Sequence, residues 1–239
     1  MSSLEDAITH YKPNKSVIEL VRATKITLLV GISGAGKDTI KKELLKRSKF
    51  RDIISHTTRP PRVNAGVMEM QDVDYHFIDL QKAEEMLADE AFVEAKLVHG
   101  NVVYGTSADE LRRSHDEGKI AITDVDVQGV AEYKDLSQNV VALFILPPNY
   151  STWRERLSRR YESDEAFQAE WDKRRKSAVR ELAHALEVPY YHFIINDELD
   201  RAVEIAGKIA AQTPDTFRRK DDEARIKARN LLEAIQVSL

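Results

Sequence analysis

Short apolar runs and longer amphipathic segments alternate along the chain from Lys25 onward. The run ITLLV at residues 26–30 leads through a glycine-rich turn into a segment with apolar residues at helical spacing. The runs beginning at Ile120 and Val140, and a third near residue 194, are continuously apolar, which is typical of strands buried on both faces. This order predicts an α/β fold whose core is a parallel sheet flanked by helices.

Three shorter strand-like pieces lie between the first predicted helix and Ile120. They are YHFI at 75–78, FVEAKLV at 92–98 and NVVYG at 101–105, and each mixes apolar with polar residues. Such a pattern suits strands with one face in solvent. We therefore predict a small mixed sheet, inserted into the main fold, as a candidate substrate-binding region.

Two charged segments follow the apolar run that begins at Val140. The first, from Ser151 to about Arg180, is rich in arginine and poor in large apolar residues, and it predicts mobile helices over a site. The second, from Pro214 onward, has apolar residues at helical spacing between charges of both signs. It predicts an amphipathic helix packed either on the core or on a second subunit.

The charge balance argues against a partner recruited by a global basic field. The chain has 36 Lys and Arg against 40 Asp and Glu, a formal net charge of -4. Neither nucleic acid nor an anionic membrane is therefore an expected partner, and any strong anion site must be local. The absence of cysteine excludes disulfides, thiolate metal sites and cysteine nucleophiles.

The apolar runs are also too short for a membrane helix. The longest, 26–30 and 140–146, fall far below the roughly 20 residues that such a helix needs. The first sixteen residues are polar, and their first charged residues are the acidic Glu5 and Asp6, whereas a secretory signal would be basic and then apolar. We expect a cytoplasmic protein.

The turn at 31–37 reads GISGAGK, the spacing of a loop that binds the phosphates of a nucleoside triphosphate. Glycines let successive backbone N–H groups converge on one anion, because side chains would block that approach. Lys37 adds a mobile cation for the β- and γ-phosphates, and the N-terminus of the following helix adds partial positive charge. The residues expected around the triphosphate are Gly31, Ser33, Gly34, Ala35, Gly36, Lys37, Asp38 and Thr39.

Asp38 stands where such loops usually carry a serine or threonine that reaches magnesium, with Thr39 next. A carboxylate beside a triphosphate is repulsive unless a metal ion or the helix terminus compensates. Asp38 is therefore either a Mg²⁺ contact, direct or through water, or a residue of the first helical turn that points aside. Asp38 and Thr39 are the candidate metal ligands.

The string SHTTRPPR at 55–62 indicates a second anion site. Arg59 and Arg62 can form a fork that clamps a phosphate, and the prolines between them stiffen the loop. Further polar groups follow downstream at Tyr75, Glu94, Tyr104 and Thr106.

Six motifs together resemble the guanylate kinase family of P-loop nucleoside monophosphate kinases. They are GISGAGKDT, SHTTRPPR, DVDYHF, FVEAKLVHGNVVYGTS, AITDVDVQGV and FILPPNYSTWRERLSRR, in the family's order, within residues 25 to 210. The resemblance implies direct transfer of the γ-phosphate of ATP, the co-substrate, to GMP or dGMP, with Mg²⁺ as the cofactor. The expected partners are these nucleotides, and the expected assembly is a monomer or a homodimer.

The resemblance also assigns roles to individual residues. The phosphate of GMP would be held by Arg59, Arg62, Tyr75 and Tyr104, and the guanine would face Ser55, Glu94 and Thr106. Glu94 has an independent rationale, because guanine offers two adjacent donors that adenine lacks, and a carboxylate accepts both. Asp124 and Asp126 would lie between the nucleotides, although Asp126 is also placed to cap the helix that follows it.

Catalysis of this kind needs positioned cations more than a nucleophilic side chain. Lys37 is one such cation. By resemblance to the family's lid, Arg160 and Arg174 are the others, whereas the neighbouring arginines are equally consistent with solvated helix charges. A closed lid would also exclude water as a competing acceptor.

These assignments divide the chain as follows. An N-terminal extension occupies 1–24, a guanylate kinase-like domain 25–212, and a C-terminal amphipathic helix 213–239. Within the domain, the core is 25–54, 108–150 and 178–212, the GMP-binding insert is 55–107, and the lid is 151–177.

The chain departs from the family pattern in two places that matter. The segment at 63–73 is longer than usual, and YESDEAFQAE replaces the glycine-containing motif common after Arg160. A smaller departure is the extra residue that VVYG carries. Two other functions stay open at this point: a sugar-phosphate kinase resembling ribose 1,5-bisphosphate phosphokinase, and a binding module that has lost catalysis. Glu94 and the DVDYHF motif argue against the first, and Lys37 argues against the second.

Overall fold

The structure is a computed structural model that describes residues 4–64, 66–98, 100–211 and 221–239. The chain forms two compact units. Unit 1 comprises 1–26, 49–123 and 132–138, and unit 2 comprises 27–48, 124–131 and 139–239. Parallel strands, a separate mixed sheet and flanking helices make this an α/β fold, as predicted.

Unit 2 holds the continuously apolar strands. β10 (Val141–Leu146) pairs in parallel with both β1 (Ile26–Val30) and β11 (Tyr191–Ile195). Every residue of β1 and β10 is buried. Successive side chains of a strand point to opposite faces of the sheet, so this burial is expected where both faces are covered by helices. Because these strands are buried along their whole length, their C-terminal ends hold the first residues of the following loops in place.

Helices complete unit 2, and each begins or ends where local chemistry dictates. α3 (Lys37–Leu45) starts directly after the glycine loop, and α9 (Leu199–Ala211) packs against it. α6 (Val127–Leu136) follows Asp126, and its residues 127–131 belong to unit 2. α7 (Tyr150–Ser158) starts at Asn149, whose side chain accepts the backbone N–H of Thr152. Such caps satisfy donors that the helix itself leaves unpaired.

The predicted lid segment contains α7 and the N-terminal part of α8 (Asp164–Glu187). Large apolar residues are few in this segment, but Trp153, Phe167 and Trp171 are buried there and their rings pack together. α8 also continues without a break through residue 177, where we placed the end of the lid. The aromatic cluster gives these helices a small core of their own.

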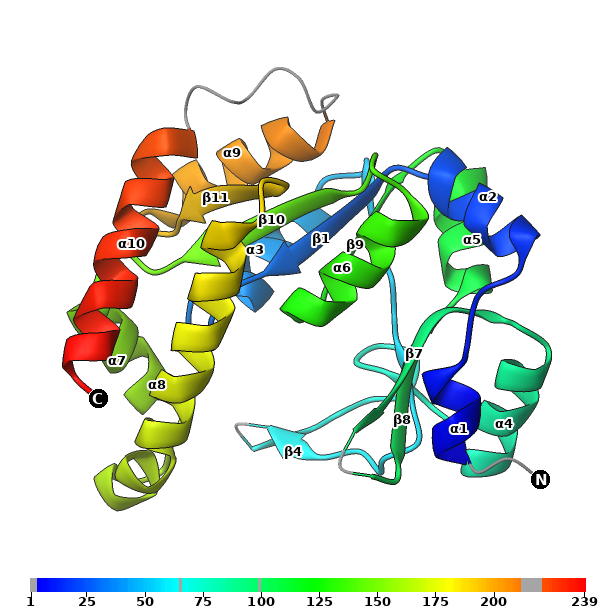
Figure 1. The fold of residues 1–239 in the computed structure, drawn as a ribbon, viewed down its shortest axis with the longest axis horizontal. Helices are drawn as coiled ribbons and strands as arrows, with labels where there is room; N and C mark the ends of the chain where they lie inside the picture. The colour runs from blue at the N-terminus through cyan, green and yellow to red at the C-terminus, as the bar shows by residue number, and fades with distance from the viewer. Residues whose placement is uncertain (1–3, 65, 99, 212–220) are drawn as a thin grey trace. The chain divides into compact units, whose positions relative to one another are not determined.

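The terminal helix α10 (Asp221–Val237) lies alongside α8 and also contacts β11 and α7 (Figure 1). Arg225 anchors it by donating to the carbonyl oxygen of Tyr191 at 3.2 Å, with its guanidinium 4.8 Å from the ring centre of Phe193. The predicted helix thus packs on its own chain. The first part of the predicted segment, 213–220, lies outside the described residues.

Unit 1 contains the mixed sheet that the sequence predicts, with strand order β6-β3-β8-β7. Its strands are β3 (His56–Thr57), β6 (His76–Phe77), β7 (Phe92–Val98) and β8 (Val102–Ser107). β3 runs parallel to β6 and antiparallel to β8, and β7 and β8 are antiparallel. A hairpin of β4 (Val63–Asn64) and β5 (Val67–Met68) occupies the segment that is longer than the family pattern.

The remaining elements of unit 1 surround these strands. β2 (Phe50–Asp52) and β9 (Ile120–Asp124) form a parallel pair, and α4 (Leu80–Ala88) and α5 (Ala108–Asp116) start at capping residues Asp79 and Ser107.

The N-terminal residues belong to unit 1. α1 (Leu4–Thr9) contacts β7 and α4, and α2 (Lys15–Ala23) contacts α5 and β7. Between them the Tyr11 hydroxyl donates to the carbonyl of Phe92 at 2.7 Å and accepts from its N–H at 2.9 Å. Burial raises the pKa of Tyr11 to about 12. Residues 4–24 of the segment that we called an extension thus pack within this unit.

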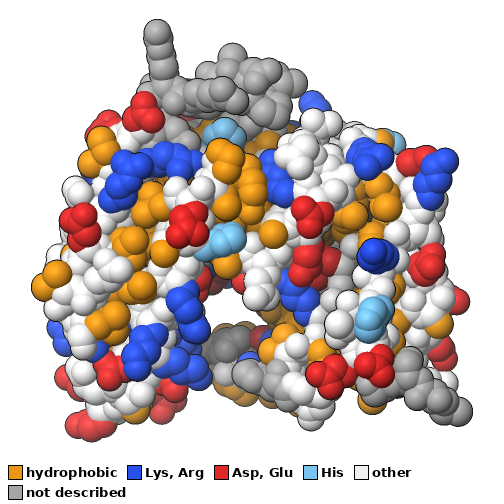
Figure 2. All heavy atoms as spheres, in the orientation of Figure 1, with side chains coloured by type: hydrophobic (Ala, Val, Ile, Leu, Met, Phe, Trp, Pro, Cys, Tyr) orange, Lys and Arg blue, Asp and Glu red, His pale blue; other side chains and the backbone are white. Residues whose placement is uncertain are grey.

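Surface properties match the composition. Acidic and basic side chains are interspersed on the face shown in Figure 2. Among the described residues, no helix combines the length and apolar composition that a membrane span requires.

Candidate functional site

The glycine loop joins the end of β1 to the start of α3 in a conformation that requires glycine. Gly31, Gly34 and Gly36 have φ values of 137°, 84° and 94°, a region that residues with a Cβ rarely adopt. Space is also lacking: a Cβ at Gly31 would lie 2.3 Å from the carbonyl oxygen of Ile145, and one at Gly36 would lie 2.2 Å from Asn196 Nδ2. The backbone of the loop is therefore open to an anion.

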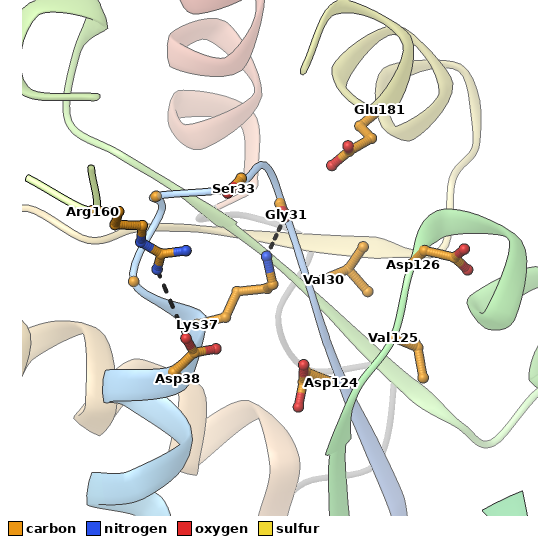
Figure 3. Close-up of a pocket in the computed structure, with 12 residues that line it drawn as sticks. Val30, Gly31, Ser33, Lys37, Asp38, Asp124, Val125, Asp126, Arg160 and Glu181 are labelled. Carbon is orange, nitrogen blue, oxygen red and sulfur yellow. Dashed lines mark hydrogen bonds and ion pairs between the residues drawn. The ribbon is translucent and has the colours of Figure 1, made fainter. Parts of the chain in front are cut away.

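Lys37, the first residue of α3, turns back over this loop (Figure 3). Its Nζ donates to the carbonyl oxygen of Gly31 at 2.5 Å. Burial lowers the pKa of Lys37, while the carboxylates of Glu181, Asp38 and Asp124 oppose that shift. The ammonium group is thus held in a partly desolvated position, where a phosphate would be attracted strongly.

Side chains from segments distant in the sequence donate hydrogen bonds to carbonyl groups of the glycine loop. The indole N–H of Trp153 on α7 donates to the carbonyl of Ser33 at 2.8 Å, and Asn196 Nδ2, just after β11, donates to the carbonyl of Ala35 at 2.8 Å. Arg156 in turn donates to the carbonyl of Asn196 at 3.0 Å. Sequence reasoning missed Trp153 and Asn196. Trp153 lies within FILPPNYSTWRERLSRR, one of the motifs that resemble the family, whereas none of the six motifs contains Asn196.

A pocket of about 320 Å³ opens over the loop and is lined by charged side chains (Figure 3). Its lining residues include Gly31, Ser33, Gly34, Gly36, Lys37, Asp38, Asp124, Asp126, Arg160 and Glu181. Arg160 Nη2 lies 3.7 Å from the Asp38 carboxylate, and Lys41 Nζ lies 3.1 Å from Asp124 Oδ1. The structure thus brings the predicted Lys37, Asp38, Asp124, Asp126 and Arg160 around one space.

A second pocket, of about 350 Å³, shares Gly34, Gly36 and Arg160 with the first and adds Thr39, Arg156 and Asn196. Arg174 lines neither pocket. Its Nε donates to the Tyr161 hydroxyl at 3.2 Å, and its Nη2 lies 3.8 Å from Glu170. Of the two predicted lid arginines, only Arg160 faces the loop in this structure.

Glu181 on α8 points into the first pocket, and sequence reasoning missed it (Figure 3). Burial raises the pKa of its carboxyl group, while a hydrogen bond from the Ser177 hydroxyl, 2.8 Å long, and the charge of Lys37 oppose the shift. A glutamate in a long charged helix gives no sequence signal that separates it from a solvent-facing residue.

The carboxylates around the loop suit a magnesium ion that is bound mainly by phosphate. Among the described residues, no group of three or more histidine or carboxylate side chains forms a ready-made cage. Mg²⁺ typically uses one or two carboxylates together with substrate phosphates. Asp38 and Asp124, both partly exposed in the pocket, supply such oxygens.

Asp126 has a structural duty as well. Its Oδ1 accepts the backbone N–H of Gly129 at 2.7 Å, which caps the N-terminus of α6. This contact matches the helix-capping alternative for Asp126, and its side chain also lines the pocket.

In unit 1 the predicted phosphate-binding residues of the acceptor site form a contact cluster. Arg59 Nε donates to the Tyr104 hydroxyl at 2.7 Å, and the Arg59 guanidinium lies 4.9 Å from the ring centre of Tyr75. Glu69, which sequence reasoning missed, accepts two hydrogen bonds from Arg59, at 2.5 and 2.8 Å. The glutamate raises the pKa of Arg59 further, so this arginine is a permanent cation.

The other predicted acceptor residues lie on the same unit. Ser55 precedes β3, and its carbonyl accepts the N–H of His76 at 2.9 Å. Arg62 is exposed. Glu94 on β7 is half-buried and pairs across the sheet with Thr106 on β8.

Thr106 is only 1% exposed. Its hydroxyl lies near the phenol of Tyr133. Burial raises the pKa of Tyr133, and the interaction with Thr106 opposes part of that shift. A carboxylate beside a buried hydroxyl is a suitable arrangement for reading hydrogen-bond donors and acceptors on a flat base.

A glycine loop between a buried parallel strand and a helix, with a lysine at the first helical position and a charged pocket above it, defines a P-loop nucleotide-binding protein. The chain belongs to the guanylate kinase family, because the family model described as guanylate kinase matches residues 23–212.

Relatives agree with this assignment. The chain is 37% identical over 187 residues to a guanylate kinase of Neisseria meningitidis serogroup A, covering 77% of this chain and 85% of the relative. It is 36% identical over 195 residues to guanylate kinase 1 of Oryza sativa subsp. japonica, covering 80% of this chain but only 49% of that longer protein. A solved guanylate kinase structure from Anaplasma phagocytophilum shares the fold, with a TM-score of 0.58, 23% identity, and coverage of 85% of this chain and 96% of that one.

Proposed function

We propose that this chain transfers the γ-phosphate of ATP to GMP or dGMP, giving ADP and the nucleoside diphosphate. The observation that carries the proposal is the pocket around Lys37 in a chain of the guanylate kinase family. An intact lysine over an open glycine loop supports catalysis, since a binding module has no need of this partly desolvated ammonium group.

The donor nucleotide would be bound by unit 2. The backbone N–H groups of 31–36 and the start of α3 would hold the β- and γ-phosphates. Lys37 would leave the Gly31 carbonyl and move to the phosphates, and Arg160 would neutralise charge that develops on the transferred group. Arg174 would join them only after the lid helix has moved.

The acceptor would be bound by unit 1. Arg59, Arg62, Tyr75 and Tyr104 would hold its phosphate, while Ser55, Glu94 and Thr106 would read the guanine. The phosphate oxygen of the acceptor is already anionic, so no strong base is needed. Asp124 and Asp126 would orient the acceptor and the ligands of the metal ion.

Mg²⁺, when bound, would supply positive charge that offsets the negative charge of the phosphates. Asp38, through its own carboxylate or a bound water, and Asp124 would hold its coordination shell, and Thr39 is the other candidate ligand. We also propose that this activity takes place in the cytoplasm, in a monomer or a homodimer.

The test is a coupled assay of ADP release from Mg-ATP across a panel of acceptors. Purified protein should respond to GMP and dGMP, and only weakly to AMP, UMP or ribose phosphates. Activity on a sugar phosphate alone would establish a sugar-phosphate kinase instead. Silence on every acceptor by a folded protein would indicate a binding module.

A further inference from the structure

Four of the five N–H donors of Arg59 are already directed at protein acceptors. Nε donates to the Tyr104 hydroxyl at 2.7 Å. One terminal nitrogen donates to the carbonyl of Pro60 at 2.9 Å and to Glu69 Oε2 at 2.5 Å, and the other donates to Glu69 Oε1 at 2.8 Å. An arginine has five such donors in a fixed plane. Among the described residues, a single N–H of Arg59 therefore has no acceptor and is left for a phosphate.

Glu69 is itself fixed on both sides. Its Oε2 also accepts the backbone N–H of Arg62 at 2.9 Å, and its own N–H donates to the carbonyl of Arg62 at 2.9 Å. These two bonds close the chain across the β4–β5 hairpin, which is the segment that departs from the family pattern. One carboxylate therefore joins both arginines of the expected fork: the side chain of Arg59 and the backbone of Arg62.

The pair is also buried. The side chains of Arg59 and Glu69 are 6% and 7% exposed, which makes their two-pronged contact a desolvated ion pair. Two parallel N–H···O bonds fix the orientation of the guanidinium plane as well as its position. Such a group cannot rotate to grip a phosphate with both terminal nitrogens unless it breaks a buried ion pair.

We propose that Glu69 is a positioning residue for the acceptor site. It holds Arg59 in place before the nucleotide arrives, so that Arg59 offers the acceptor phosphate a fixed positive charge and one N–H instead of a two-pronged clamp. Arg62, whose side chain is exposed, is then the arginine that can adapt to the phosphate. This role rests on the proposed transfer to GMP, and it adds to that function the residue that prepares its acceptor site.

Preorganisation predicts a particular kinetic signature. A site whose cation is already oriented loses little entropy on binding. Loss of Glu69 should therefore weaken the binding of the acceptor nucleotide and leave the binding of ATP unchanged. A merely structural role would instead reduce stability and weaken the binding of both substrates.

The experiment compares wild-type protein with Glu69→Gln and Glu69→Asp, and with Glu84→Gln, an exposed glutamate of α4, as the control. Glu69→Gln should raise the KM for GMP about 10-fold or more, because hydrogen bonds to charged groups are lost. The KM for ATP should change less than about 2-fold, and Glu84→Gln should match wild type. Glu69→Asp keeps the charge that neutralises Arg59 but shortens its reach, so it should fold and still raise the KM for GMP.

A second measurement needs no substrate. In ¹⁵N NMR spectra of the nucleotide-free protein, the Nε–H of Arg59 should give a resolved resonance that exchanges slowly with water, and Glu69→Gln should speed up that exchange. The resonance is assigned by its loss in Arg59→Lys.

The outcomes separate this inference from the proposed function. An unchanged KM for GMP in folded Glu69→Gln or Glu69→Asp, or an equal rise in the KM for both substrates, would overturn the positioning role. If wild-type protein transfers no phosphate to GMP, the proposed function fails and the resonance alone decides: faster exchange in Glu69→Gln supports the role, and unchanged exchange overturns it.

Discussion

Lys37 Nζ lies 2.5 Å from the carbonyl oxygen of Gly31, so the lysine of the glycine loop is bonded to the first residue of the same loop. This contact gives the buried ammonium group a partner within the protein. It is also a contact that a bound phosphate would replace. The protein therefore holds a charge in a place that suits a ligand better than it suits the unliganded fold.

Replacement of Lys37 by methionine should separate activity from stability. We expect kcat/KM for phosphate transfer to fall about 10²-fold or more, as when one donor that stabilises a transition state is removed. Stability should be unchanged or higher. Burial lowers the pKa of Lys37, so between the folded and unfolded pKa values the unfolded chain binds more protons, and the charged lysine costs the fold stability at neutral pH.

The coupled assay and thermal unfolding of the same preparation measure both effects. A Lys37→Met protein with wild-type turnover, or one that unfolds far below the wild type, would contradict this account.

Gly36 offers a second test, since both its backbone angle and its surroundings exclude a side chain. In Gly36→Ala the new Cβ would meet Asn196 Nδ2 at 2.2 Å and break the bond from Asn196 to the carbonyl of Ala35. Gly118 is the matched control, because its φ is 63° but no other atom of the described residues lies within 4 Å of its Cβ position. Gly118→Ala should cost about 1–2 kcal/mol of stability through backbone strain alone.

Gly36→Ala should cost more than Gly118→Ala in urea unfolding and should abolish ATP binding, measured by calorimetry. Equal losses of stability, with ATP binding retained in both, would show that the contact between Gly36 and Asn196 does not shape the loop.

The parts of the fold that the sequence predicts well are those with local signals. Continuous apolarity identifies β1 and β10 because both faces of these strands are buried. The glycine loop is recognisable because glycine and lysine spacing has few other uses. Asp126 illustrates the limit of such signals: its position predicts two duties, and the structure shows it capping α6 while it lines the pocket.

Residues whose role comes from distant partners were missed. Trp153 meets Ser33 across 120 residues, and Asn196 meets Ala35 across 161. Glu69 lies only ten residues from Arg59, yet it sits in a segment of unusual length where no pattern indicates a pair. Long-range packing decides these contacts, and single-residue patterns carry no information about it.

Glu94→Gln tests whether the Glu94 carboxylate recognises the guanine base of GMP through hydrogen bonds. A carboxylate accepts two hydrogen bonds side by side, whereas an amide presents one donor to one of the guanine donors and leaves a group unpaired. We expect kcat/KM for GMP to fall about 100-fold or more. ATP affinity should be unchanged, because Glu94 belongs to the mixed sheet of unit 1 and the glycine loop to unit 2.

Steady-state kinetics with GMP, and ATP binding by calorimetry, give the two numbers, with Glu84→Gln again as the control. Equal loss of ATP binding and GMP turnover would contradict the assigned role of Glu94.

His56 predicts how stability depends on pH. Burial, with a smaller contribution from the positive charge of His76, lowers the pKa of His56 to about 4 from an ordinary value of 6.5. The rings of His56 and His76 are 4.5 Å apart, and His56 also packs edge-on against Phe92. The folded protein thus keeps His56 neutral in a range where the unfolded chain protonates it.

The sign of the effect follows from proton binding. Between about pH 6.5 and pH 4 the unfolded state carries the extra proton, so stability should fall as the pH is lowered through this range. Two carboxylates oppose the lowering of the His56 pKa, because Asp109 and Asp72 favour its protonated form. The neighbouring His76 ring lies 2.6 Å from Asp72 and 3.4 Å from Glu110. Urea unfolding of wild type and His56→Gln at several values from pH 4.5 to 7.5 measures the slope. His56→Gln should be less stable than wild type at pH 7.5 but should lose less stability on acidification. Its free energy of unfolding should change less steeply with pH, by at most the slope that one bound proton gives. Parallel curves for the two proteins would show that His56 does not set the pH dependence.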